Sequence, residues 1–167
     1  EKPTLFVCNH SSYIDILILG TFVPARFVAK QEVAKWPVMG WLATNQGTLY
    51  IDRSRTAIAE GTDKLLDYLD KKESLILFPE GTTSDGCRIL PFASSFFDVA
   101  MKKNVTVQPI TITYAGWDRL PMPYFMRKVC GWFSPDVDLV SHLWTIAQWG
   151  TVQVVVDIHP PLKAADF

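Results

Sequence analysis

Several features that define common protein classes are scarce in this sequence of 167 residues. Three cysteines occur, at positions 8, 87 and 130, without the spacing of a metal site, and an odd number cannot all pair. That usage favours a reducing compartment, so we expect the domain to face the cytoplasm. The net charge is -1 and no basic run occurs, which argues against nucleic acid as a partner. No apolar stretch reaches the ~18 residues of a membrane span.

The length and the pattern of apolar runs predict a single layered domain over residues 1–167. A chain of this size can bury one sizeable core but is short for two, and it contains no repeats or low-complexity tracts. Helical patterns, clearest over residues 56–71, alternate with apolar strands. This alternation predicts an α/β fold with a mixed, largely parallel sheet flanked by helices. Strands are expected at residues 4–8, 25–29, 47–51, 74–78, 105–113 and 151–158, with Pro109 marking an edge or a bulge.

A first polar motif follows the first predicted strand. His10 lies just after that strand, and Asp15 lies near the start of an apolar helical segment. Ser12 and Asp15 have the spacing of a capping box, and Ser11 is the other possible cap, so the helix is expected to begin here with His10 in the loop. If Asp15 accepts a hydrogen bond from one imidazole nitrogen, the other nitrogen is free to take a proton from a hydroxyl. Asp15 as a simple helix cap is the competing interpretation.

A second polar motif, residues 78–84, follows the fourth predicted strand. Loops at the carboxyl ends of strands are where open α/β sheets place their sites. Gly81 allows the backbone to approach a ligand, and the amides near Gly81 and Thr82 could point at an oxygen that becomes negative during acyl transfer. An ordinary turn with a solvated Glu80 is the alternative.

Taken together and in order, these motifs resemble the glycerolipid acyltransferases typified by 1-acyl-glycerol-3-phosphate acyltransferase. His10 and Asp15 match the histidine–four residues–aspartate signature of that family. Three further blocks resemble its remaining motifs, namely residues 47–53 (Gly-Thr-Leu-Tyr-Ile-Asp-Arg), 78–82 (Phe-Pro-Glu-Gly-Thr) and 107–110 (Val-Gln-Pro-Ile). The resemblance extends from Asn9 to about Tyr114.

The resemblance implies transfer of a fatty acyl group from acyl-CoA or acyl carrier protein to the hydroxyl of a lysolipid. His10 would deprotonate the hydroxyl, Asp15 would orient the imidazole, and Glu80 and Gly81 would complete the catalytic set. A thiolate leaving group has a pKa of about 8.5, so no metal or other cofactor is required. Cys8, two residues before His10, is interpreted as a buried core thiol rather than a nucleophile.

The same resemblance suggests which residues bind the acceptor. Arg53 occupies the position where the family uses arginine against phosphate, and the secondary candidates are Arg88, Lys30, Thr82 and Thr83. Thr83 stands where many members carry arginine, which removes one cation from the expected headgroup site. The family as a whole implies a lysophospholipid such as 1-acyl-glycerol-3-phosphate as the leading acceptor, and the missing cation makes lyso-ornithine lipid, which has no phosphate, the close alternative.

Two other classes of function compete with the transferase. A hydrolase could use the same histidine to activate water, although the sequence has no Gly-x-Ser-x-Gly elbow. A lipid-binding module without catalysis would keep the pocket and make His10 dispensable. His142 has no carboxylate at comparable spacing, and we expect it on a helix surface, with a position facing the cleft as the alternative.

Six tryptophans and 49% hydrophobic residues suggest contact with a membrane surface. Residues 116–138 have weak periodicity and predict an irregular surface segment, with a lid or part of an acyl channel as the alternative. The chain starts at Glu1 without an initiator methionine and enters a strand almost at once. We therefore expect it to be part of a longer, membrane-anchored protein.

Overall fold

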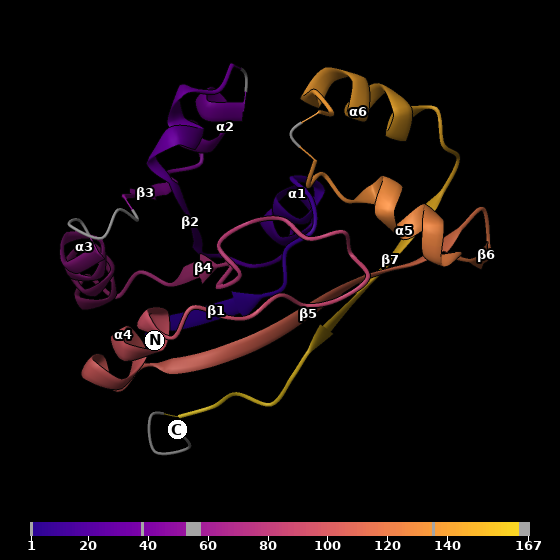
Figure 1. The fold of residues 1–167 in the computed structure, drawn as a ribbon. Helices are drawn as coiled ribbons and strands as arrows, with labels where there is room; N and C mark the ends of the chain where they lie inside the picture. The colour runs from indigo at the N-terminus through magenta and orange to yellow at the C-terminus, as the bar shows by residue number, and fades with distance from the viewer. Residues whose placement is uncertain (1, 38, 53–57, 135, 164–167) are drawn as a thin grey trace.

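The described residues of this computed structural model are 2–37, 39–52, 58–134 and 136–163, and within them seven strands form one sheet (Figure 1). Arg53, which the sequence predicts to bind the acceptor, lies outside the described residues. The spatial order is β3-β2-β4-β1-β5-β6, and β7 pairs with β5. Their bounds are Thr4–Cys8 (β1), Arg26–Lys30 (β2), Leu49–Ile51 (β3), Leu75–Leu77 (β4), Thr106–Trp117 (β5), Leu120–Pro121 (β6) and Val152–Ile158 (β7).

The first five strands run parallel to their neighbours, and β6 and β7 are antiparallel to β5. The mixed, largely parallel sheet predicted from the alternation is confirmed. Every strand except the two-residue β6 was expected, and β1 and β4 read as continuous apolar runs because parallel strands are buried on both faces. In β4, for example, Leu75, Ile76 and Leu77 are all inaccessible to solvent.

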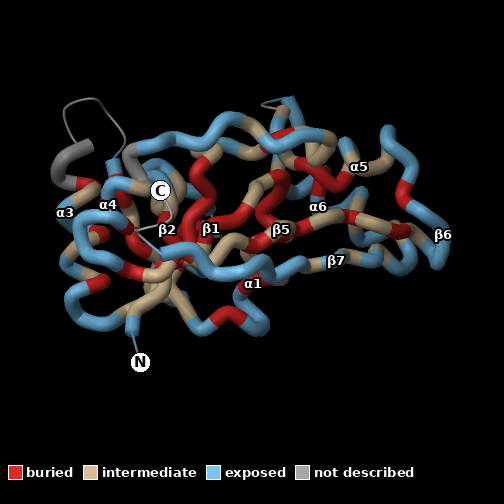
Figure 2. Tube along the Cα trace, turned by 90° about the horizontal axis from the view of Figure 1, so that it is seen from below, coloured by how far each residue is buried: buried red, intermediate tan, exposed pale blue. Residues whose placement is uncertain are grey.

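Helices cover both faces of this sheet. They are α1 (Ile14–Gly20), α2 (Met39–Asn45), α3 (Ile58–Asp70), α4 (Ser95–Lys103), α5 (Tyr124–Cys130) and α6 (Leu139–Ala147), and a 3₁₀ turn, η1 (Gln31–Lys35), precedes α2. Leu65 of α3 and Val99 of α4 share one core cluster with Leu5 of β1. Leu19 of α1 and Cys130 of α5 belong to a second cluster on the opposite face. Figure 2 shows the buried residues following the central strands between these layers.

Two sequence expectations concern the second half of the chain. Pro109 lies in β5, and the pairing of β5 with the C-terminal segment shifts by one residue between Ile110–Ile158 and Val107–Leu162, so the irregularity expected at Pro109 is present. A second shift falls between Tyr114 and Gly116. Proline is tolerated there because β7 pairs with β5 only from Ile110 onward. Residues 116–138, expected to be irregular, contain β6 and α5. Among the helices described, none is both long and apolar enough to cross a bilayer.

Candidate active site

The two polar motifs meet at the carboxyl ends of adjacent strands. β1 and β4 are neighbours in register, with Val7 opposite Leu77, so the loops that leave them begin side by side. The backbone N–H of Ser84 donates to the carbonyl of His10 at 2.8 Å and holds the two loops together. Parallel pairing therefore brings together motifs that are about seventy residues apart in the chain.

His10 and Asp15 form a hydrogen-bonded pair. Nδ1 of His10 lies 2.9 Å from Oδ2 of Asp15, and the imidazole stacks on the ring of Phe78 with 3.9 Å between centroids. The His10 side chain is 15% exposed and Asp15 is fully buried. Because a carboxylate only accepts hydrogen bonds, the neutral imidazole carries its proton on Nδ1. Nε2 is the nitrogen left for a substrate.

Four donors surround the Asp15 carboxylate. Oδ2 accepts the backbone N–H groups of Ser11 and Ser12 at 2.8 and 2.9 Å in addition to His10. Oδ1 accepts the hydroxyl of Tyr114, which reaches across from β5 at 2.7 Å. Burial and the adjacent Asp15 charge raise the pKa of Tyr114, so its hydroxyl remains a donor. This set of donors compensates the burial of a charge that would otherwise be costly.

The predicted capping box is realised only in part. The helix begins at Ile14, later than expected, and the Ser12 hydroxyl accepts the N–H of Ile14 at 3.4 Å rather than that of Asp15. Asp15 does reach back to the backbone of Ser12, as the box requires. The Asp15 carboxylate thus both caps the helix and orients His10, so the two interpretations of Asp15 are compatible.

Glu80 supports the backbone of the first loop. Oε1 accepts the N–H of His10 and Oε2 accepts that of Leu90, both at 2.7 Å. Burial raises the pKa of Glu80, and the two N–H donors oppose that shift. Both carboxylate oxygens of Glu80 accept backbone N–H groups, so Glu80 holds the backbone of His10 in place. The alternative of a solvated Glu80 is wrong.

In the described part of the chain, the turn after β4 leaves backbone donors without a partner beside the cavity. Gly81 has a φ of 72°, a left-handed conformation that favours glycine, and its N–H donates to the carbonyl of Phe78 at 3.1 Å. The Gly81 amide is therefore used within the turn. The next two amides, those of Thr82 and Thr83, have no hydrogen-bond partner among the described residues, and both residues line the pocket described next. These two amides are therefore available to a ligand oxygen.

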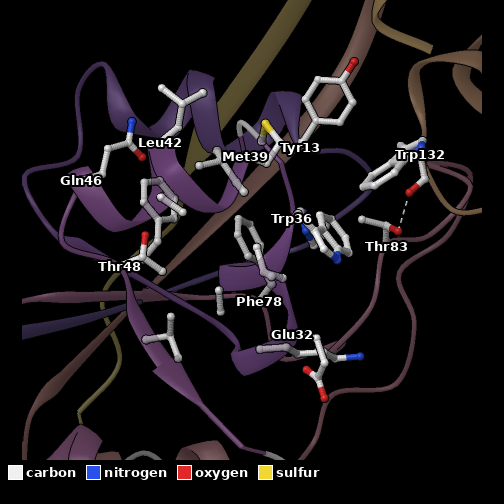
Figure 3. A pocket seen from close by; sticks show the side chains of 18 of the residues that line it. Tyr13, Glu32, Trp36, Met39, Leu42, Gln46, Thr48, Phe78, Thr83 and Trp132 are labelled. Atoms are coloured by element: carbon white, nitrogen blue, oxygen red, sulfur yellow. Dashed lines mark hydrogen bonds between the residues drawn. The ribbon is translucent and has the colours of Figure 1, made fainter. Parts of the chain in front are cut away.

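An apolar cavity of about 370 Å³ opens beside His10. Its walls come from β2, α1, η1 and α2, and Figure 3 shows Met39 and Leu42 above Phe78 with Trp36 and Trp132 alongside. Most of the other residues that line it are also apolar, including Ile16, Leu17, Phe27, Val28, Ala29, Val33 and Ala43. A cavity of this size and lining suits a ligand with a hydrocarbon chain.

The predicted acceptor-binding residues are not all brought to this cavity. Lys30, Thr82 and Thr83 line it, and Lys30 is exposed at its edge. The hydroxyl of Thr83 donates to the carbonyl of Trp132 at 2.6 Å. Arg88 is exposed on the loop beyond Glu80 and does not line the cavity, so the structure offers no support for it as a contact.

Three residues near the site escaped sequence reasoning or were placed wrongly. Tyr114 was not singled out, and Trp132 was considered only among the tryptophans of a membrane surface, because neither belongs to a local polar pattern. His142, expected on a helix surface, is buried, and its Nδ1 lies 3.1 Å from the Tyr13 hydroxyl. Cys8 is buried as expected, and burial raises the pKa of its thiol, which makes it a poor nucleophile.

Comparison with known proteins identifies relatives with similar sequences. The chain is 35% identical over 168 residues to lyso-ornithine lipid O-acyltransferase of Brucella abortus, an alignment covering 96% of this chain and 62% of that protein. It is 31% identical over 169 residues to 1-acyl-sn-glycerol-3-phosphate acyltransferase of Neisseria gonorrhoeae, covering 99% and 64%. The chain thus spans less than two thirds of the length of these relatives.

A solved structure and a family model agree with these relatives. The crystal structure of the 1-acyl-sn-glycerophosphate acyltransferase PlsC from Thermotoga maritima matches all of this chain and 58% of its own, with a TM-score of 0.61 and 25% identity. The family model described as Acyltransferase matches residues 1–113, which include both polar motifs and most of the sheet. The chain belongs to the Acyltransferase family.

Proposed function

We propose that this domain is an O-acyltransferase that moves a fatty acyl group from a thioester, acyl-CoA or acyl carrier protein, to the hydroxyl of a lysolipid. The observation that carries the proposal is the His10–Asp15 pair at the wall of an apolar cavity. The pair supplies a base with a defined tautomer, and the cavity can accommodate a hydrocarbon chain. Both named relatives are lipid O-acyltransferases, which supports the same conclusion.

The residues suit direct transfer. Nε2 of His10 accepts the hydroxyl proton as the oxygen attacks the thioester carbon, and Asp15 stabilises the imidazolium that forms. The free amide of Thr82 stabilises the negative carbonyl oxygen of the tetrahedral intermediate. Collapse of that intermediate breaks the C–S bond, and the thiolate leaves and takes up the proton held by His10. The products are an ester and a free thiol.

For the acceptor we favour lyso-ornithine lipid, with a lysophospholipid as the second candidate. Thr83 supplies no cation, and its hydroxyl is already donated to Trp132, which argues against a strong phosphate site at this position. The higher identity to the Brucella enzyme, 35% against 31%, supports the same choice. A phosphate-bearing acceptor is the second candidate because Lys30, at the edge of the cavity, could supply a cation for the phosphate.

We also propose that the domain rests on a membrane surface through exposed apolar side chains. Trp41 of α2, Phe125 of α5, and Val140 and Trp144 of α6 are between 68% and 75% exposed. Figure 1 shows α2 and α6 extending to the same side of the sheet. Tryptophan suits such an interface because it has a large apolar body and one polar group. A Trp144→Ser variant should bind anionic phospholipid vesicles roughly tenfold more weakly in sedimentation assays.

Thiol release from palmitoyl-CoA tests the reaction, with lyso-ornithine lipid, 1-acyl-glycerol-3-phosphate or no acceptor. We expect release that depends on an acceptor and is abolished in His10→Ala. Release without an acceptor would identify a hydrolase. Absence of release with both CoA and carrier-protein thioesters, together with unchanged palmitoyl-CoA binding in His10→Ala, would indicate a lipid-binding module instead.

A further inference from the structure

His142 connects α6 to the loop that carries His10. It is the buried residue of a helix whose Val140, Leu143 and Trp144 are exposed. Its Nε2 lies 2.8 Å from the carbonyl of Val129, and its Nδ1 lies 3.1 Å from the Tyr13 hydroxyl. A carbonyl only accepts, so Nε2 carries the proton and the lone pair of Nδ1 accepts from Tyr13.

Tyr13 belongs to the cavity wall as well as to the first motif. It lies between His10 and Asp15 in the chain, is 5% exposed and lines the cavity. Its ring contacts that of Trp132 edge-on, with centroids 5.8 Å apart, and Trp132 contacts Trp36 in the same manner at 5.3 Å. These three rings form a continuous aromatic side of the cavity (Figure 3).

The segment that leads to α6 is bonded to both motif loops. The N–H of Trp132 donates to the carbonyl of Ser11 at 2.8 Å, and the carbonyl of Trp132 accepts the Thr83 hydroxyl. The Trp132 backbone is therefore held independently of His142. The Tyr13 side chain differs, because its hydroxyl has His142 as its hydrogen-bond partner. Loss of His142 would leave that hydroxyl unpaired in a buried position.

We propose that His142 is a positioning residue that fixes Tyr13, and with it the aromatic side of the cavity, for binding of the acyl chain. The proposal rests on the acyltransferase function proposed above. The match to the family model ends at residue 113, so α6 and His142 lie beyond the matched segment. Nδ1 of His10 is held by Asp15, whereas the hydrogen bonds of His142 go to Tyr13 and Val129. His142 should therefore affect substrate binding far more than the chemical step.

Four variants separate the two hydrogen bonds. Tyr13→Phe removes the hydroxyl, and His142→Ala removes both bonds. His142→Asn retains a polar group near the Nδ1 position facing Tyr13, whereas His142→Gln retains one near the Nε2 position facing Val129. KM and kcat are measured for palmitoyl-CoA with a lysolipid acceptor. The Kd of palmitoyl-CoA without acceptor is measured by tryptophan fluorescence, and the melting temperature of each variant is recorded.

We expect Tyr13→Phe and His142→Gln each to raise KM and Kd roughly fivefold to tenfold, with kcat changed less than about twofold. His142→Asn should stay within about twofold of the parent protein. The Tyr13→Phe/His142→Gln double variant should be no worse than either single variant, because both remove the same bond.

A purely structural role predicts a different pattern. In that case His142→Asn and His142→Gln would raise the Kd equally, and the increase would follow the decrease in melting temperature. The effects of the two substitutions in the double variant would be additive. Either result would overturn the proposal. If neither the parent protein nor any variant releases thiol, the proposed acyltransferase function is wrong. Even then, the ranking of the variants by their Kd for palmitoyl-CoA tests the role of His142.

Discussion

The hydrogen bond from Tyr114 to Asp15 should be the most energetically important contact outside the two motifs. It joins β5 to α1 across 99 residues of sequence at 2.7 Å. Both residues are buried, since Tyr114 is 4% exposed and Asp15 is 0% exposed. Oδ1 of Asp15 has the Tyr114 hydroxyl as its donor, whereas Oδ2 has three others. Tyr114→Phe therefore removes the donor of one buried carboxylate oxygen without changing the shape of the core.

The expected cost follows from the burial and the charge. A hydrogen bond to a charged group contributes about 1.5–3 kcal/mol, so the free energy of unfolding should fall by about 2 kcal/mol. For a domain of this size a change of 1 kcal/mol moves the melting temperature by about 2–4 °C, so the expected decrease is about 4–8 °C. The value of kcat should fall less than about tenfold, because Oδ2 still holds His10.

Urea unfolding and calorimetry measure this effect, with Tyr50→Phe as the matched control. The Tyr50 hydroxyl lies 3.0 Å from the Thr44 hydroxyl and 3.3 Å from the Gly40 carbonyl, but Tyr50 is half-buried and water can replace it. The control should lose less than about 1 kcal/mol. If Tyr114→Phe is no more destabilising than Tyr50→Phe, the argument that Tyr114 compensates the buried Asp15 charge is wrong.

Three further predictions concern activity and pH. Asp15→Asn should lower kcat at least about a hundredfold with a smaller change in KM, because the imidazolium loses its counter-charge; a loss below tenfold in steady-state assays would contradict this role. Ala43→Leu should shift preference to shorter acyl chains, with each excluded methylene costing about fourfold in relative kcat/KM; an unchanged profile would place the chain elsewhere. Because the pKa of Glu80 is raised, this carboxyl group binds a proton more tightly in the folded protein than in the unfolded chain. Its contribution to stability is therefore fully present below the ordinary glutamate pKa of about 4.3. That contribution declines as the pH rises through the pKa of Glu80 in the folded protein. The stability advantage of the parent over Glu80→Gln in urea should accordingly be larger at acidic pH than at neutral pH, and the opposite slope would refute the assignment.

Local patterns in the sequence were sufficient for much of the fold and for the two motifs. Continuous apolar runs marked the parallel strands, because such strands are buried on both faces. His10 and Asp15 are only five positions apart in the chain, so their spacing allowed the hydrogen bond between them to be considered, with a simple helix cap as the alternative. Pro109 marked an irregularity of β5, because proline has no N–H for regular strand pairing.

The partners of the site were decided only by tertiary structure. Asp15 receives Tyr114, Glu80 supports the backbone of His10 from 70 residues away, and Tyr13 meets His142 across 129 residues. No periodicity encodes such pairs, because each depends on which side chains the sheet order brings together. Helix α6 is apolar on several sides, so its pattern could not indicate that His142 faces inward. The sequence by itself pointed to the His10–Asp15 pair, whereas the structure determined what holds that pair and encloses the cavity beside it, because burial and hydrogen bonding between distant segments exist only once the chain is folded.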